Sequence, residues 1–117
     1  MQIVAVKEYK LRYPVLEKFA NSSSWNTSRS AQVVEVVTDN GITGWGEGSG
    51  GLKGGSAEGH VIGRSPFDTE TIWQDLFENG ESPRAISGVD IALWDILGKA
   101  LEKPVWQLLG GKVRDRI

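Results

Sequence analysis

The sequence contains no cysteine, which excludes disulfide bridges, thiolate metal sites and cysteine nucleophiles. It also lacks any run of Lys or Arg, and its 13 basic and 15 acidic residues give a formal net charge of -2. Nucleic acid is therefore not an expected partner. No stretch approaches the roughly 18 apolar residues of a membrane span, and the N-terminus lacks the pattern of a secretory signal. We expect a cytoplasmic protein that does not enter a membrane.

The first 47 residues predict an antiparallel sheet. Side chains alternate between two faces over residues 3–13, which indicates a first strand. Residues 31–38 are dense in β-branched side chains, and Asp-Asn-Gly at 39–41 is typical of a tight hairpin leading to a third strand at 42–47. Residues 15–30 show neither helical nor strand periodicity, so they predict a long loop.

The second half of the chain predicts helices. Asp68 stands where it can cap a first helix, and an apolar stripe follows it. Asn79 and Gly80 predict the end of this helix. The longest periodic segment, residues 86–101, places its apolar residues on one helical face and ends before Pro104. A further short turn is expected after that proline.

The stretch between the sheet and the helices, residues 48–63, is rich in glycine. Each glycine inside a helix costs about 1 kcal/mol relative to alanine, so this stretch predicts a flexible link rather than a helix. Its glycines do not follow the spacing of a phosphate-binding loop.

These elements together predict an α+β fold, in which a three-stranded antiparallel meander is followed by a small helical segment. We expect a single domain with four parts: sheet at 1–47, link at 48–65, helices at 66–111 and the start of a linker at 112–117.

One long motif carries a resemblance to a known family. Residues 87–99 read Ser-Gly-Val-Asp-Ile-Ala-Leu-Trp-Asp-Ile-Leu-Gly-Lys, and residues 104–111 read Pro-Val-Trp-Gln-Leu-Leu-Gly-Gly. Both resemble the signature helix and exit turn of the mandelate racemase and muconate lactonizing group of the enolase superfamily. Gly-Trp-Gly-Glu at 44–47 and the helix start at 62–68 are similar to that group as well. The resemblance covers nearly the whole chain and identifies an enolase N-terminal-like cap.

The resemblance implies a parent enzyme with two domains. The cap precedes a modified (β/α)8 barrel, in which carboxylates hold Mg²⁺ and a Lys or His removes a proton α to a carboxylate. The parent would be an acid-sugar dehydratase or a racemase that acts on a small carboxylate or acid-sugar substrate. The catalytic barrel is absent from these 117 residues, so no catalytic residue, metal ligand or bound Mg²⁺ is expected in this chain.

Three residues are candidate substrate contacts. Residues 15–30 resemble the family's specificity loop, which folds over the barrel mouth, and Phe19 and Trp25 are its natural lid residues. The alternative is that both aromatic side chains close the end of the sheet. Glu47 stands at the end of a strand that opens onto a loop, where an acid can contact a ligand or a partner domain.

Other polar residues favour structural roles. Asp90 and Asp95 are five apart on the long helix and point to different faces, so a paired acid–base role is geometrically poor. Asp95 stands four residues before Lys99, which predicts an ion pair or a contact with a neighbouring segment. His60 has no metal-ligating neighbour and is expected to be a solvated loop residue, and Arg64 is expected to hold a turn or pair with an acid.

Two departures from the family pattern leave a second hypothesis open. The resemblance implies an additional helix between the hairpin and residue 66, and the glycine-rich link stands in its place; the connection at 78–84 is also abbreviated. Either this chain is the capping and specificity part of a Mg²⁺-dependent enzyme, or it is a non-catalytic module that oligomerises or binds another protein. Its expected partners are a barrel domain or a second copy, as in a homo-oligomer.

Overall fold

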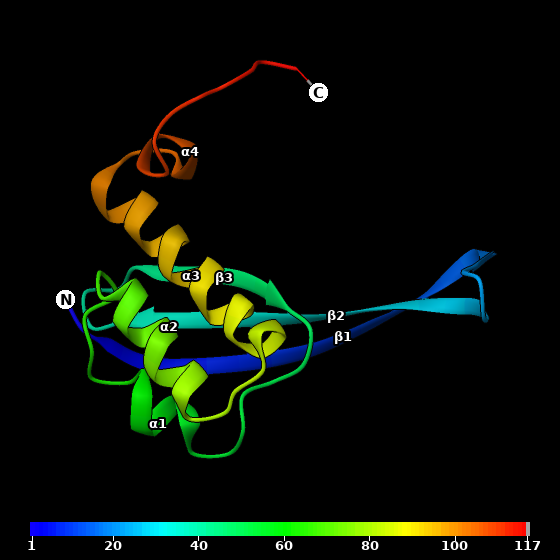
Figure 1. Ribbon diagram of the computed structural model, residues 1–117, viewed down its shortest axis with the longest axis horizontal. Coiled ribbons are helices and arrows are strands. Elements are labelled where there is room, and N and C mark those ends of the chain that lie inside the picture. The colour runs from blue at the N-terminus through cyan, green and yellow to red at the C-terminus, as the bar shows by residue number, and fades with distance from the viewer. Residues whose placement is uncertain (117) are drawn as a thin grey trace.

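The computed structural model describes residues 1–116 and has one three-stranded antiparallel sheet followed by four helices (Figure 1). The α+β fold with its antiparallel meander is therefore confirmed. No helix in the described part of the chain is long and apolar enough to cross a membrane. The elements are β1 (Ile3–Ala20), β2 (Trp25–Thr38), β3 (Thr43–Gly48), α1 (Ser56–His60), α2 (Thr69–Glu78), α3 (Pro83–Leu101) and α4 (Val105–Leu108).

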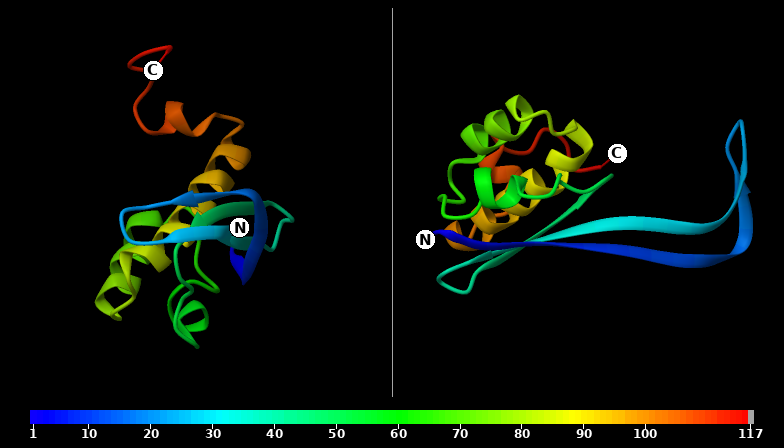
Figure 2. Two further views of the ribbon diagram at one scale, coloured as in Figure 1. Left: turned by 90° about the vertical axis from the view of Figure 1, so that its right-hand side faces the viewer. Right: turned by 90° about the horizontal axis from the view of Figure 1, so that it is seen from below.

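The loop predicted at residues 15–30 is wrong, because β1 and β2 continue through it as a long two-stranded hairpin (Figure 2). Pro14 lies opposite Ser28 and does not end the strand. β1 is an edge strand, in which a proline without an N–H is tolerated. The register shifts between Pro14 and Phe19, which marks a bulge near the tip of the hairpin.

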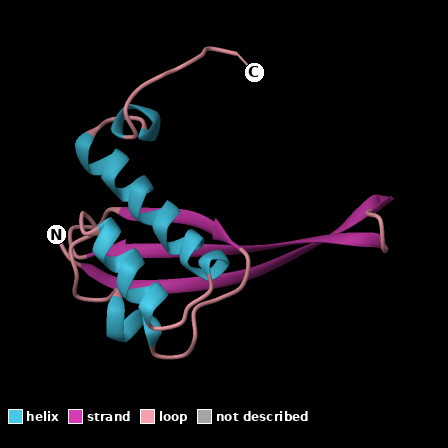
Figure 3. Cartoon of the chain, viewed as in Figure 1, coloured by secondary structure: helices cyan, strands magenta, loops and turns pink. Residues whose placement is uncertain are grey.

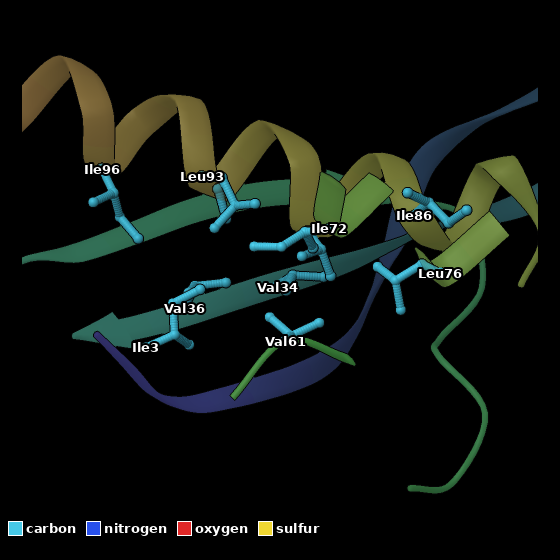
Figure 4. Close-up of a cluster of buried hydrophobic side chains, with 11 residues drawn as sticks. Ile3, Val34, Val36, Val61, Ile72, Leu76, Ile86, Leu93 and Ile96 are labelled. Carbon is cyan, nitrogen blue, oxygen red and sulfur yellow. The ribbon is translucent and has the colours of Figure 1, made fainter. Parts of the chain in front are cut away.

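The sheet has one covered face. Alternate residues of β2, including Val34 and Val36, are buried there because strand side chains alternate between the two faces. The helices α1, α2 and α3 lie on this face, whereas no helix among the described residues lies over the opposite face (Figure 2). Burial of one such aliphatic side chain stabilises the fold by about 1.5–3 kcal/mol. The core in Figure 4 includes Ile3, Val34, Val36, Val61, Ile72, Leu76, Ile86, Leu93 and Ile96.

Glycines allow α3 to approach β3 unusually closely. A Cβ atom on Gly46 would lie 2.0 Å from the carbonyl oxygen of Gly88, and one on Gly44 would lie 2.1 Å from that of Ala92. Gly48 has the backbone of Arg84 as a similar neighbour, at 2.9 Å. The backbone of the helix therefore rests directly on the backbone of the strand, with no side chain between them.

The expectation that residues 48–63 contain no helix is wrong, because α1 forms within them (Figure 3). Glu81, which is only 4% exposed, holds this turn in place. Its carboxylate accepts hydrogen bonds from the Ser56 hydroxyl and from the backbone N–H of Lys53 at 3.0 Å. Asn79 donates to Ser56 at 3.1 Å. These tertiary hydrogen bonds offset the low helix propensity of glycine.

The helix starts differ in how they are capped. Asp68 is at the N-cap of α2 as predicted, but its side chain makes no capping hydrogen bond. α3 begins at Pro83, three residues before the predicted start, because Ser82 accepts a hydrogen bond from the N–H of Ala85 at 3.2 Å. A proline at the first helical position adds to this start signal.

Gly46→Ala should lower the free energy of unfolding by about 1–3 kcal/mol, because the added methyl group must push α3 away from β3. Urea denaturation followed by tryptophan fluorescence measures this change. Gly54→Ala is the matched control, since a Cβ atom there meets nothing within 4 Å, and its effect should stay within about 0.5 kcal/mol. Equal unfolding midpoints for the two variants would contradict the close contact.

Candidate functional site

Two of the candidate residues lie near the tip of the β1–β2 hairpin. Trp25 pairs with Ala20 and Phe19 pairs with Asn26, so the two aromatic residues stand on adjacent strands with their side chains on opposite faces of the ribbon. The Arg29 guanidinium lies over the Phe19 ring, 3.9 Å from its centroid, in a cation–π contact. Trp25 is 73% exposed, and the hairpin projects away from the helices (Figure 1). The Trp25 ring therefore presents aromatic surface that the rest of the described chain does not cover, whereas Phe19 is half-buried beneath Arg29.

Glu47 lies apart from that tip. It pairs with Val33, seven residues along β2 from Asn26, which is about 23 Å at roughly 3.3 Å per residue. Glu47 lines two hollows at the end of β3, of about 540 and 300 Å³. Arg12, Tyr13 and Ser30 are among the other lining residues. Phe19 and Trp25 therefore lie near each other along the hairpin but on opposite faces, and Glu47 lies farther back along the sheet.

The uncovered face of the sheet carries a polar and aromatic cluster. The Tyr9 hydroxyl donates to Glu35 at 2.7 Å, and the Lys7 ammonium lies 3.4 Å from the same carboxylate. The hydrogen bond to Glu35 is the main cause that raises the pKa of Tyr9. The Tyr9 and Trp45 rings are tilted, with centroids 6.1 Å apart. This cluster ties together all three strands on the open side.

Sequence reasoning missed a groove between α3 and α4. The groove measures about 600 Å³, and most of its lining side chains are apolar or aromatic. The sequence did carry a signal for this groove, because the apolar residues Ile91 and Trp94 lie outside the buried stripe of α3. The lining residues are Trp45, Asp90, Ile91, Trp94, Asp95, Val105 and Leu109. We name this feature the α3–α4 groove.

Asp90 is half-buried in the lining of the α3–α4 groove. Desolvation is the main cause that raises its pKa, and the negative charge of Glu70 adds to the effect. No hydrogen bond or ion pair to its carboxylate is found among residues 1–116. It differs in this respect from the other acid of the groove.

The structural roles predicted for Asp95 and Arg64 are confirmed. The Asp95 carboxylate accepts from Lys99 at 2.6 Å and from the backbone N–H of Trp45 at 2.9 Å, so it ties α3 to β3. Arg64 pairs with Asp75 of α2. His60 was predicted in a loop, but it ends α1, because the hydrogen bonds described above stabilise that short helix.

The acids of this chain do not fit a magnesium site. Mg²⁺ prefers several oxygen ligands that converge on one point. No group of three His, Cys, Asp or Glu residues that could hold a metal ion occurs within residues 1–116. Asp75, Glu81 and Asp95 already accept hydrogen bonds from other groups of the chain.

The family of the chain follows from its sequence and its fold together. Residues 4–110 match the mandelate racemase / muconate lactonizing enzyme N-terminal domain. The chain therefore belongs to this family and is its N-terminal capping domain, within the enolase superfamily.

The curated relatives include a dehydratase and a cycloisomerase. D-galactarolactone cycloisomerase of Agrobacterium fabrum is 36% identical over 129 residues, which cover all of this chain and 34% of the relative. D-galactonate dehydratase of Klebsiella pneumoniae is 40% identical over 113 residues, which cover 86% of this chain and 30% of the relative. The chain thus spans about a third of the length of these relatives. The alignment to the cycloisomerase is longer than this chain, so the relative carries additional residues within the matched region.

A solved structure shares the fold. Dipeptide epimerase from Enterococcus faecalis, complexed with Mg and the dipeptide L-Leu-L-Tyr, superposes with a TM-score of 0.81 at 30% identity. The match covers 95% of this chain and 35% of the epimerase. The region described above therefore corresponds to the cap portion of a longer enzyme fold.

Asp90→Asn should stabilise the folded chain at neutral pH. The folded-state pKa of Asp90 is raised above its ordinary value of 3.8, so the folded state loses this proton less readily than the unfolded state. Deprotonation of Asp90 therefore lowers the free energy of unfolding as the pH rises through the unfolded-state and then the folded-state pKa. At pH below both pKa values Asp90 has no such effect. Unfolding temperatures of dilute protein, compared from acidic to neutral pH, should diverge as pH increases.

Asp68→Asn is the matched control for that comparison. It removes an exposed acid whose side chain makes no capping hydrogen bond, so its unfolding temperature should track the parent chain at each pH. An Asp90→Asn variant that is less stable than the parent at neutral pH would contradict the desolvation argument.

Proposed function

We propose that this chain is the capping and specificity domain of a Mg²⁺-dependent enzyme that removes a proton α to the carboxylate of an acid sugar. The observation that carries the proposal is the β1–β2 hairpin, which projects from the body with Phe19 and Trp25 at its tip. A two-stranded ribbon is only marginally stable in water by itself. Its exposed Trp25 side chain, with the half-buried Phe19 nearby, is suited to close over another domain.

The hairpin tip would act by excluding water from the reacting carboxylate. Removing water strengthens each charge interaction at the site, including stabilisation of the developing enolate. Phe19 and Trp25 supply apolar surface for this purpose, and Arg29 holds the Phe19 ring in place. Neither aromatic side chain takes part in the proton transfer itself.

Glu47 would contact the same substrate or the partner domain from a second position. It lines two hollows at the end of β3, where its carboxylate can accept hydrogen bonds from sugar hydroxyl groups. Because Glu47 lies far from the hairpin tip in this chain, a ligand or a barrel domain would have to span the two positions.

The metal and the base would come from the rest of the enzyme. Residues 1–116 provide no cluster of metal-ligating side chains, so this chain contributes enclosure and specificity. The dehydratase and cycloisomerase relatives, at 40% and 36% identity, support a hydroxylated carboxylate as the substrate class.

A domain exchange tests the proposed function. The chain replaces the matched cap of the Klebsiella pneumoniae D-galactonate dehydratase, and turnover of D-galactonate with Mg²⁺ is measured. Activity of the exchanged enzyme, together with its absence when the cap is deleted, is the expected result. A soluble, folded exchange enzyme without turnover on any acid sugar of a panel would contradict the proposal.

Phe19→Ala and Trp25→Ala should each lower kcat/KM of the exchanged enzyme by about tenfold, equivalent to about 1.4 kcal/mol of transition-state stabilisation. The reason is that each truncation admits water to the enclosed site. Phe67→Ala is the matched control, since this exposed aromatic residue lies before α2 and outside the hairpin. Equal kinetic constants for all three variants would assign the hairpin aromatics to sheet closure alone.

A further inference from the structure

The smaller of the two hollows at Glu47, of about 300 Å³, has one wall that comes from the glycine-rich link. Ser49 and Gly50 follow directly after β3 and line this hollow together with Glu47. A Cβ atom on Gly50 would meet nothing within 4 Å, so packing does not hold the wall at that residue. The position of the wall therefore depends on how the link is held on either side of it.

Glu8 of β1 holds the link just beyond that wall. One oxygen of its carboxylate accepts a hydrogen bond from the backbone N–H of Leu52 at 2.8 Å, and the other accepts from the side-chain amide of Gln32 on β2 at 3.0 Å. A Cβ atom on Gly51 would lie 2.2 Å from the Glu8 carboxylate, so the backbone of the link lies directly on this group. Hydrogen bonds to a charged acceptor are stronger than those to a neutral one. Glu8 thus joins β1, β2 and the link.

Other hydrogen bonds hold the link to the helical side of the molecule. The N–H of Ser49 donates to the carbonyl oxygen of Arg84 in α3 at 3.1 Å. The N–H of Lys53 donates to the carboxylate of Glu81, which lies just before α3, at 3.0 Å. The link then continues to α1 (Figure 1). These bonds join the link to the helices, whereas Glu8 joins it to the sheet that forms the opposite wall of the hollow. The width of the hollow therefore depends on Glu8.

We propose that Glu8 is a positioning residue for substrate binding. Its carboxylate holds residues 49–52 against the sheet and so fixes the distance between the link and Glu47. This inference rests on the proposed function, in which Glu47 accepts hydrogen bonds from the hydroxyl groups of an acid sugar. A wall that is held in place before the substrate arrives saves the cost of ordering the link on binding. Glu8 touches no substrate and acts through the backbone of the link.

Three substitutions of Glu8 separate its geometry from its charge. Glu8→Ala removes both hydrogen bonds. Glu8→Asp keeps the charge but is one methylene shorter, so it cannot reach Leu52 and Gln32 together. Glu8→Gln keeps an oxygen that accepts from Leu52, and its amide N–H donates to Gln32 once the Gln32 amide is turned over. The first two variants should release the link, whereas Glu8→Gln should behave like the parent chain.

Hydrogen exchange of the Leu52 amide, measured by NMR on the 117-residue chain, tests whether Glu8 holds the link. In Glu8→Ala and Glu8→Asp this amide should exchange about tenfold faster than in the parent, because its acceptor is lost or displaced. The Trp45 amide is the internal reference, since it also donates to a carboxylate, that of Asp95, and its exchange should stay unchanged. Unchanged exchange of Leu52 in both variants overturns the proposal.

Steady-state kinetics of the exchanged dehydratase test whether that position matters for the substrate. Glu8→Ala and Glu8→Asp should each raise KM for D-galactonate about tenfold and change kcat by less than about twofold, because the hollow binds the substrate and its transition state alike. Glu8→Gln should keep the parent KM. Asp75→Ala is the matched control: it removes another carboxylate that holds the link, through Arg64, but it does not line the hollow. It should lower the unfolding temperature and leave KM unchanged.

The two measurements distinguish the possible failures. An unchanged KM for Glu8→Ala and Glu8→Asp in an active exchanged enzyme overturns the proposal. An equal rise of KM in Asp75→Ala also overturns it, because Glu8 would then act through stability alone. An exchanged enzyme that carries the parent cap and shows no turnover contradicts the proposed function, and with it the role of Glu8 in substrate binding. Hydrogen exchange at Leu52 then still decides whether Glu8 holds the link.

Discussion

The direct contact between the backbones of β3 and α3 is the constraint on which the other features depend. Gly44, Gly46 and Gly48 leave no Cβ atom in the way, so the helix lies against the strand. That approach brings the apolar stripe of α3 over β2 and closes the core. It also carries Asp95 to the N–H of Trp45 on the edge strand, which has no strand partner on that side.

The same contact determines which surfaces remain open. Because α3 occupies one face of β2 and β3, the opposite face of the sheet and the far part of the β1–β2 hairpin have no covering helix in the described residues. Where α3 passes the edge of β3, its outward side chains meet Trp45 and form the α3–α4 groove.

The sequence predicted the elements whose signals are local. Helical periodicity of the apolar side chains predicted 16 residues of the long helix. Strand alternation and turn chemistry predicted the antiparallel meander with its tight hairpin at 39–41. The extension of β1 and β2 through residues 15–30 could not be predicted in this way, since pairing between two exposed strands depends on backbone hydrogen bonds and needs no alternation of apolar residues. The turn α1 was missed because Glu81, 21 residues or more from that segment, supplies its hydrogen bonds.

For the candidate site, too, some features were predictable from the sequence and others depended on the tertiary structure. By itself, the sequence determined the family, the three-stranded meander and the Asp95–Lys99 ion pair, because motif and spacing act over neighbouring residues. Only the tertiary structure decided that Phe19 and Trp25 lie near the hairpin tip on opposite faces while Glu47 lies farther back, since strand register sets those positions. It also decided that Asp90 loses part of its solvent in an apolar groove, because desolvation arises from elements that are distant in sequence and packed together in space.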